Sequence, residues 1–196
     1  MARTIRATLL LGALALSACA APPVPKEQYF RLVVSPATEK VAHPIAGVVE
    51  VVPFAADGVA GERPLLFTGN GTKLEQRNYA YWTDVPVAML RDQTISYLRS
   101  AGLADKVVPS ELRIGGTYRI QGDIKRLEQA VADSKSAGIV ELELSLIDED
   151  TDALVVSKVY HSEQPAADDT IDAAVTALDA GLLDILKRFT ADIDAR

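Results

Sequence analysis

The feature that most constrains this fold is a series of segments in which apolar and polar residues alternate, followed by one long amphipathic segment. Alternation is strict over residues 117–125 and again over residues 140–146. A period of two is typical of a strand that buries one face and exposes the other. Residues 170–194 instead space their apolar side chains as a helix does. The sequence therefore predicts a sheet with one solvated face and a helix against the other.

Two early segments predict further strands. Residues 29–34 and 47–54 are rich in β-branched and aromatic side chains. The second segment is almost continuously apolar, as expected of a strand that is covered on both faces or lies at the centre of a sheet, and Glu50 interrupts it. We interpret Glu50 as a side chain exposed at a sheet edge, with a functional carboxylate as the alternative.

Two hairpins are predicted from paired segments with a turn signal between them. Residues 63–68 and 73–82 flank Asn-Gly at residues 70–71, a pair that favours tight hairpins because both residues tolerate positive φ. Residues 140–146 and 154–161 flank an acidic turn in the same way.

A helix is predicted between these hairpins. Thr83 or Asp84 can cap its start, Pro86 fits its first turn, and Gly102 follows its end. The fold class that we predict is α+β: a single two-layer domain with a mostly antiparallel or mixed sheet and two main helices packed on one face.

The N-terminus has the three parts of a secretory signal. Arg3 and Arg6 supply positive charge, residues 7–16 form an apolar run, and Leu-Ser-Ala-Cys ends at Cys19. Ten apolar residues rise only about 15 Å as a helix, which is too short to cross a bilayer. The order leucine, small, small, cysteine resembles the lipobox of bacterial lipoproteins, in which the cysteine sulfur receives diacylglycerol and the new amino terminus is acylated.

This resemblance divides the chain into three parts. Residues 1–18 are expected to be a lipoprotein signal peptide, residues 19–28 a lipidated cysteine with a proline-rich tether, and residues 29–196 the folded domain. Ala20 stands where an aspartate would, by resemblance to Gram-negative sorting signals, retain a lipoprotein in the inner membrane. We therefore expect a lipid anchor at the periplasmic face of the outer membrane.

Composition excludes several functional classes. The formal charge is −7 and the chain lacks a basic stripe, which argues against a nucleic-acid partner. One cysteine permits neither an internal disulfide framework nor a thiolate metal site.

The chain is also poor in catalytic groups. The only histidines are His43 and His161, and no GxSxG elbow is present. Asp148, Asp150 and Asp152 imitate the start of a calcium loop, but the glycine and glutamate that complete such a loop are missing. We predict no enzymatic activity, no cofactor and no metal.

The best candidate for a partner or ligand surface is the junction between the first hairpin and the helix. It concentrates aromatic and soft apolar side chains, namely Tyr79, Tyr81, Trp82, Pro86 and Met89. Such side chains suit a protein partner or an apolar ligand. Core packing is the alternative interpretation of the same residues.

The order of these features resembles the ABC-type transport auxiliary lipoprotein family, whose PqiC-type members are membrane-integrity lipoproteins that work with Mce-domain lipid transporters. The resemblance covers most of the chain after Cys19. It is carried by five collinear motifs: YFRL at 29–32, VVEVVPFAADG at 48–58, RPLLFTGNG at 63–71, YAYWTDVPVAML at 79–90, and YLRSAGL with the following VVP within 97–109.

The resemblance implies a non-enzymatic component that helps to move lipids between the inner and outer membranes. The ATPase and the permease would be other chains, and Cys19 would be the anchor. Expected partners are an Mce-domain protein, the membrane that holds the anchor, phospholipid, and further copies of the chain. Tyr79, Tyr81, Trp82 and Pro86 match the family's aromatic-to-proline segment.

Two other functions stay open at this stage. An outer-membrane assembly or peptidoglycan-associated scaffold would use the same anchor and a similar small domain. A lipid-modifying enzyme would require a polar pocket that converges on His43 or His161.

Overall fold

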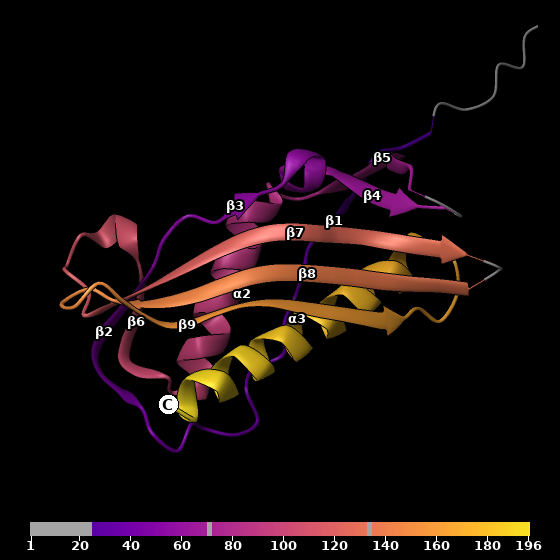
Figure 1. Cartoon of the computed structure of the whole chain (residues 1–196). Coiled ribbons are helices and arrows are strands. Elements are labelled where there is room, and N and C mark those ends of the chain that lie inside the picture. The colour runs from indigo at the N-terminus through magenta and orange to yellow at the C-terminus, as the bar shows by residue number, and fades with distance from the viewer. Residues whose placement is uncertain (1–24, 70–71, 133–134) are drawn as a thin grey trace, which may run out of the picture.

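One mixed sheet of nine strands, with two long helices packed on it, forms the described part of the chain (Figure 1). The computed structural model describes residues 25–69, 72–132 and 135–196. The strands are β1 (Gln28–Phe30), β2 (Ile45–Val51), β3 (Ala55–Ala56), β4 (Pro64–Thr68), β5 (Leu74–Trp82), β6 (Ala104–Pro109), β7 (Tyr118–Ala132), β8 (Lys135–Asp148) and β9 (Ala153–Pro165). The helices are α2 (Pro86–Ala101) and α3 (Ile171–Asp194), and the 3-10 turns are η1 (Gly58–Gly61) and η2 (Ser110–Leu112).

Strand β7 organises the sheet. Along one edge it pairs antiparallel with β8, which in turn pairs antiparallel with β9. Along its other edge it pairs in parallel with β2, then β3, then β4. Strand β6 extends the sheet beyond β2, and β5 and β1 extend it beyond β4. The sheet is therefore mixed, as the α+β prediction allowed.

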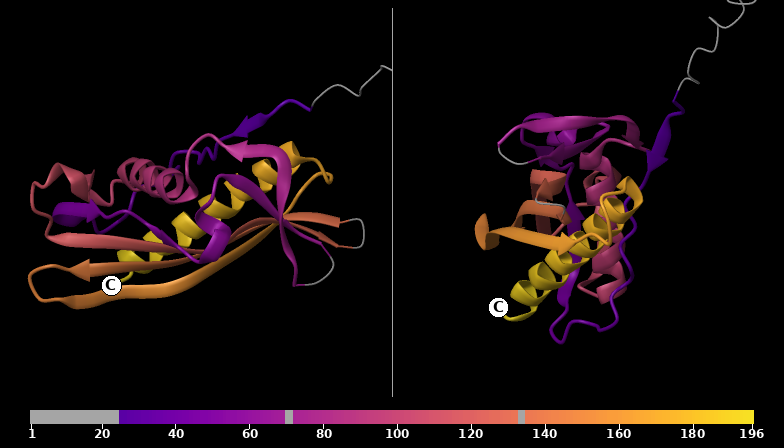
Figure 2. Two further views of the ribbon diagram at one scale, coloured as in Figure 1. Left: turned by 90° about the horizontal axis from the view of Figure 1, so that it is seen from above. Right: turned by 90° about the vertical axis from the view of Figure 1, so that its right-hand side faces the viewer.

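The two helices cover the inner face of the sheet (Figure 2). Val140, Leu142, Leu144 and Leu146 of β8 are completely buried there. Phe189 of α3 is equally buried, and its ring meets the ring of Tyr160 of β9 edge to face at 5.8 Å. The alternation in β8 thus points its apolar side chains at α3, and the predicted two-layer arrangement is confirmed.

The two predicted hairpins are confirmed, and the consecutive strands β7 and β8 form a further antiparallel pair. Strands β4 and β5 pair antiparallel, as do β8 and β9. The turn expected at residues 70–71 lies outside the described residues. Strand β7 extends to Ala132, beyond the predicted 117–125. The prediction stopped too early because the register shifts between Ile124 and Arg126, and this shift ends the simple alternation in the sequence.

The interpretation of Glu50 as an edge residue is wrong. Strand β2 lies between β6 and β7, and Glu50 is in register with Val108 on one side and Arg119 on the other. Its Oε1 atom is buried without a hydrogen-bond partner among residues 25–69, 72–132 and 135–196. The long apolar run around Glu50 belongs to an interior strand.

The start of α2 also differs from the prediction. Val85 is the N-cap residue, and within the described chain no side chain caps this helix. The Asp84 carboxylate instead accepts a hydrogen bond from the Val85 amide at 2.7 Å. Pro86 occupies the first turn, and Gly102 ends the helix with a φ of +65°, as expected.

The predicted first strand is shorter than expected because the chain leaves the sheet after Phe30. Residues 31–44 cross both helices as an extended strap. Their backbone amides are bound by helix side chains, which gives the strap partners in place of a neighbouring strand. The contacts are Val33 to Asp179 at 2.8 Å, Val34 to Gln93 at 2.9 Å, Ala37 to Ser100 at 2.8 Å, and Ala42 and His43 to Asp194 at 3.0 and 2.6 Å.

The predicted signal peptide and Cys19 lie outside the described residues, as does most of the tether. Within the described ranges, neither α2 nor α3 combines the length and apolar character that crossing a membrane requires.

Candidate functional site

Strand β5 contains an irregularity at the segment that the sequence singled out. Its pairing with β4 moves from Leu66 opposite Gln76 to Pro64 opposite Tyr81, so β5 holds extra residues in this interval. Tyr79 lies within it with a φ of +60°, in the left-handed region that bulky residues rarely adopt. The Tyr79 side chain is exposed. An irregular strand with an outlying aromatic residue is typical of a functional surface.

Parallel pairing of β1 with β5 brings a second tyrosine to the same place. Tyr29 lies in register with Tyr81, and the two ring centroids are 5.9 Å apart. Tyr29 is 55% exposed. We call Tyr29, Tyr79 and Tyr81 the aromatic surface.

Arg63 contacts the aromatic surface through the ring of Tyr29. Its guanidinium carbon lies 5.8 Å from the centre of the Tyr29 ring, within reach of a cation–π interaction. Its Nε and Nη2 atoms donate to the Trp82 carbonyl at 3.3 and 3.2 Å. The guanidinium therefore connects the start of β4 to the end of β5.

The other predicted site residues lie in the core. Trp82 is 1% exposed and Met89 9% exposed, and Pro86 is also buried. The Thr83 hydroxyl lies 3.8 Å from the Met89 sulfur. The structure thus separates the predicted segment into Tyr79 and Tyr81, which reach the surface, and Trp82, Pro86 and Met89, which are buried.

The aromatic surface carries hydroxyl groups but no strong nucleophile. The Tyr29 hydroxyl donates to the Glu27 carboxylate at 2.5 Å, and this hydrogen bond raises the pKa of Tyr29 above its ordinary value. Tyr29 therefore stays neutral under physiological conditions. Neutral tyrosines offer an apolar ring together with a polar tip, which suits contact with lipid headgroups or with a protein.

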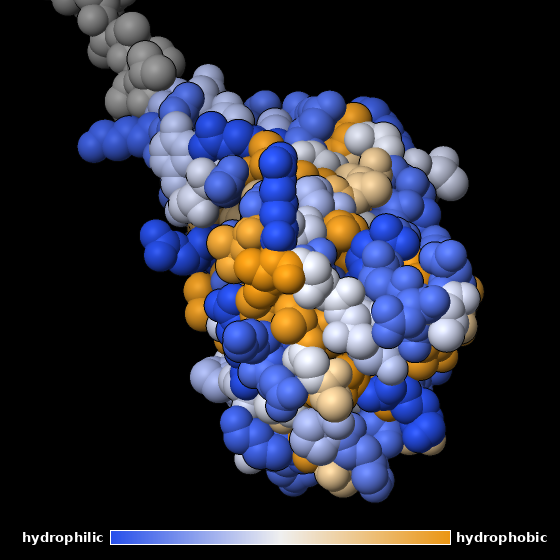
Figure 3. Space-filling view, turned by 90° about the vertical axis from the view of Figure 1, so that its left-hand side faces the viewer, coloured by the Kyte–Doolittle hydropathy of each residue, from blue (hydrophilic) through white to orange (hydrophobic). Residues whose placement is uncertain are grey.

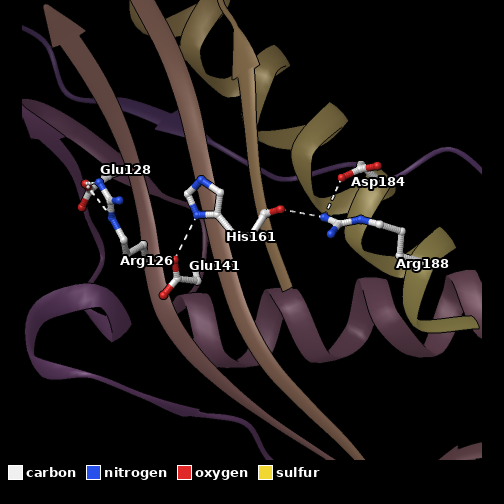
Figure 4. Close-up of polar contacts among 6 residues, drawn as sticks. All are labelled: Arg126, Glu128, Glu141, His161, Asp184 and Arg188. Carbon is white, nitrogen blue, oxygen red and sulfur yellow. Dashed lines mark hydrogen bonds and ion pairs between the residues drawn. The ribbon is translucent and has the colours of Figure 1, made fainter. Parts of the chain in front are cut away.

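Polar and charged side chains of β7, β8 and β9 form a series of contacts that reaches α3 (Figure 4). Nδ1 of His161 lies 2.9 Å from the Glu141 carboxylate. Arg188 donates to the His161 carbonyl and to the Asp184 carboxylate, both at 2.7 Å. These contacts join neighbouring groups on β8, β9 and α3, and they give both the side chain and the backbone of His161 structural partners.

The remaining polar candidates have structural roles. Nδ1 of His43 lies 3.2 Å from the backbone carbonyl of Asp194, so His43 belongs to the contact between the strap and α3. The Asp148 carboxylate accepts from the amides of Asp150 and Thr151, both at 3.0 Å, and thereby caps the turn before β9. Within the described ranges, no group of three or more His, Cys, Asp or Glu side chains is placed to hold a metal ion.

The fold and its surfaces define a small α+β domain whose most distinctive feature is an exposed aromatic cluster next to its N-terminal entry. The family model described as "ABC-type transport auxiliary lipoprotein component" matches residues 30–189. The chain therefore belongs to the ABC-type transport auxiliary lipoprotein family. Among curated protein sequences, none matches it.

Solved structures share this fold. The crystal structure of protein XCC0632 from Xanthomonas campestris, of the family DUF330, is 18% identical, with a TM-score of 0.74 over 86% of this chain and 96% of that chain. A crystal structure described as that of an uncharacterized protein is 14% identical, with a TM-score of 0.69 over 86% of this chain and 99% of that chain. These similarities confirm the arrangement of sheet and helices.

Proposed function

We propose that this chain is an outer-membrane-anchored periplasmic lipoprotein that serves, without enzymatic activity, as the auxiliary component of an Mce-type lipid transport system. The observation that carries the proposal is the family match over residues 30–189, which begins shortly after a lipobox ending in Cys19. The ATPase, the permease and the Mce-domain protein are other chains. The role of the system is to maintain the envelope.

The anchor brings the aromatic surface close to lipid. Acyl chains at Cys19 contribute about 0.8 kcal/mol per buried methylene, so several chains hold the protein to the leaflet. From Cys19 to Tyr29 a fully extended chain spans at most about 35 Å, at roughly 3.3–3.6 Å per residue. Tyr29 therefore cannot move far from the anchoring leaflet.

The chemistry of the aromatic surface fits this position. Tyrosine side chains are enriched where a membrane meets water, because the ring tolerates the acyl boundary while the hydroxyl stays hydrated. Tyr29 and Tyr79 are exposed, and Tyr81 is half-buried with its ring beside that of Tyr29. We assign the aromatic surface to contact with phospholipid.

Photo-crosslinking in intact cells tests this assignment. A photoreactive amino acid at position 81 is expected to yield phospholipid adducts by mass spectrometry, and these adducts are expected to fall sharply in a Cys19→Ser variant. Position 159 is the matched control, because Val159 is 51% exposed on β9, away from β1 and β5. Equal lipid labelling from positions 81 and 159, in a folded and lipidated protein, would contradict the assignment.

A further inference from the structure

Two side chains of opposite charge lie next to the ring of Tyr29 on the aromatic surface. The carboxylate of Glu27 accepts a 2.5 Å hydrogen bond from the Tyr29 hydroxyl, and the guanidinium carbon of Arg63 lies 5.8 Å from the centre of the ring. Both charges reach the hydroxyl: the hydrogen bond and the charge of Glu27 raise the pKa of Tyr29, and the charge of Arg63 acts in the opposite direction. The aromatic surface therefore offers a cationic and an anionic group beside one exposed ring.

Arg63 is held by neutral partners. Its Nε and Nη2 atoms donate to the Trp82 carbonyl, and Nη2 also reaches the Thr83 carbonyl at 3.4 Å. Within the described ranges its Nη1 atom has no hydrogen-bond partner and no carboxylate pairs with it, whereas Arg119 and Arg188 each pair with one. A guanidinium that is fixed by backbone carbonyls keeps its charge for an external anion, and its planar shape matches phosphate oxygens.

The other side of the site favours a cation. The Glu27 side chain is exposed, and its carboxylate can accept further hydrogen bonds beside the one from Tyr29. The faces of tyrosine rings also attract cations, and the rings of Tyr29 and Tyr81 lie 5.9 Å apart at this place. A primary ammonium group can donate to the carboxylate while it contacts the rings. A quaternary ammonium group has no N–H to donate.

We infer that the aromatic surface selects phospholipids with an ethanolamine headgroup, with Arg63 binding the phosphate and Glu27 binding the primary ammonium group. This inference rests on the proposed function, because it names the headgroup that the surface contacts. The ethanolamine headgroup carries both charges and matches both side chains at once. A glycerol headgroup leaves Glu27 without a cation, and a choline headgroup cannot donate a hydrogen bond to it.

A second exposed apolar surface provides an internal control. The connection between β6 and β7 forms the pink turn at the left of Figure 1, whereas the chain enters the described part at the upper right. Leu112 and Ile114 are exposed within this connection. Seen from this end, apolar side chains gather near the middle of the surface (Figure 3). Position 112 therefore reports the lipid contact that apolar exposure produces without Arg63 and Glu27.

The test reconstitutes the full-length, lipidated chain in vesicles with equal amounts of phosphatidylethanolamine, phosphatidylcholine and phosphatidylglycerol. A photoreactive amino acid at position 81 is expected to give adducts in which the ethanolamine lipid exceeds each other lipid by about threefold, as measured by mass spectrometry. Adducts from position 112 are expected to follow the vesicle composition. Adducts from both positions in the vesicle proportions would overturn the inference and leave lipid contact by the aromatic surface intact. Absence of lipid adducts from position 81 would count against both.

Two variants assign the two halves of the headgroup. Arg63→Gln is expected to lower all adducts from position 81 about fivefold, because every phospholipid carries the phosphate. Arg63→Lys keeps the charge and is expected to recover part of that loss. Glu27→Gln is expected to abolish the excess of ethanolamine lipid and to leave the total yield unchanged, a change of composition that a loss of structure would not produce. An equal fall in all three lipids with Glu27→Gln would overturn its assigned role.

Arg113→Gln is the matched control, because it removes an exposed arginine from the β6–β7 connection and should change neither yield nor composition. Equal thermal midpoints for all variants confirm that folding is intact. Inorganic phosphate, compared with chloride at the same ionic strength, distinguishes a lipid headgroup from a free anion. Adducts that persist in phosphate support the headgroup, and adducts that phosphate alone removes would show that Arg63 binds a free anion and would overturn the inference.

Discussion

At the scale of single residues, Tyr79 combines an unfavourable backbone conformation with an exposed aromatic ring. Its φ of +60° lies where a Cβ atom collides with the following peptide, at a cost of about 1–2 kcal/mol. The exposed ring gains too little burial to offset that cost. Such a residue is typical of a position where binding, and not stability, determines the side chain.

Two variants separate the backbone strain from the ring. Tyr79→Ala and Tyr79→Gly both remove the ring, but only glycine relieves the left-handed strain. We expect Tyr79→Gly to be about 1 kcal/mol more stable than Tyr79→Ala in urea unfolding. Both variants should lose lipid crosslinks from position 81. Equal stability of the two variants would show that Tyr79 is not strained.

The partly buried carboxyl group of Asp179 makes the stability of the protein depend on pH. Burial raises the pKa of Asp179 to about 6, although its carboxylate accepts a hydrogen bond from the Val33 amide. Because this pKa exceeds that of the unfolded chain, the folded state binds more protons between about pH 4 and pH 6, and its contribution to stability falls as pH rises through that window. Asp179→Asn keeps the acceptor oxygen and removes the charge. We expect it to raise the free energy of unfolding at pH 7.5 by about 1 kcal/mol, a value reduced for partial exposure, and to have little effect at pH 4.

Asp194 is the control, because its contribution to stability changes with pH in the opposite direction. Hydrogen bonds from the Ala42 and His43 amides lower the pKa of Asp194 below its usual range. Its stabilising contribution is therefore present above the unfolded pKa and is lost as pH falls. Asp194→Asn should destabilise the protein at pH 7.5 and should matter progressively less below pH 4. The same pH profile for both variants would contradict these roles of the strap contacts.

At the scale of elements, the close packing of α3 on the sheet depends on Gly138 of β8. A Cβ atom at position 138 would lie 2.7 Å from the Leu178 amide nitrogen and 2.8 Å from the Ala177 carbonyl carbon. Both are backbone atoms of α3, so neither can move without shifting the helix. Gly138 is therefore required by the close approach of helix and strand.

Gly138→Ala is expected to lower the free energy of unfolding by about 1–3 kcal/mol, the usual cost of overpacking. The measurement is urea unfolding monitored by circular dichroism. Gly69→Ala is the matched control because an added Cβ there meets nothing within 4 Å. An equally small effect at both positions would mean that α3 is free to shift away from β8.

The elements that the sequence predicted well are those whose pattern is local. Alternation identified β8, and the 3.6-residue period identified α3 almost to its ends. The bulge after Ile124 concealed half of β7, because it breaks the period on which the prediction depends. The continuous apolar run of β2 indicated an interior strand, but the sequence could not identify β7 as the parallel partner of β2, β3 and β4, since these partners lie far apart in the chain.

At the scale of the whole molecule, the candidate site could be predicted only in part. Tyr79 and Tyr81 were recognisable because aromatic residues cluster in one segment. Trp82 belongs to the same cluster, but the strand turns it into the core. Tyr29 and Arg63 join the aromatic surface through tertiary contacts alone, so local patterning could not identify them.

The two ends of the molecule have distinct chemistry. The entry end carries the tyrosines of β1 and β5, and the distal end carries Leu112 and Ile114 on a turn fixed by Arg91. The formal charge of −7 of the whole chain also disfavours nonspecific adsorption to anionic surfaces.

The most direct test is to identify what copurifies with the anchored chain after crosslinking in intact cells. The role that we propose predicts an Mce-domain protein together with an ATPase and a permease, and predicts that this set is lost when Cys19→Ser releases the chain from the membrane. Recovery of outer-membrane assembly or peptidoglycan-associated proteins, with no Mce-domain protein from a folded and lipidated chain, would contradict that role.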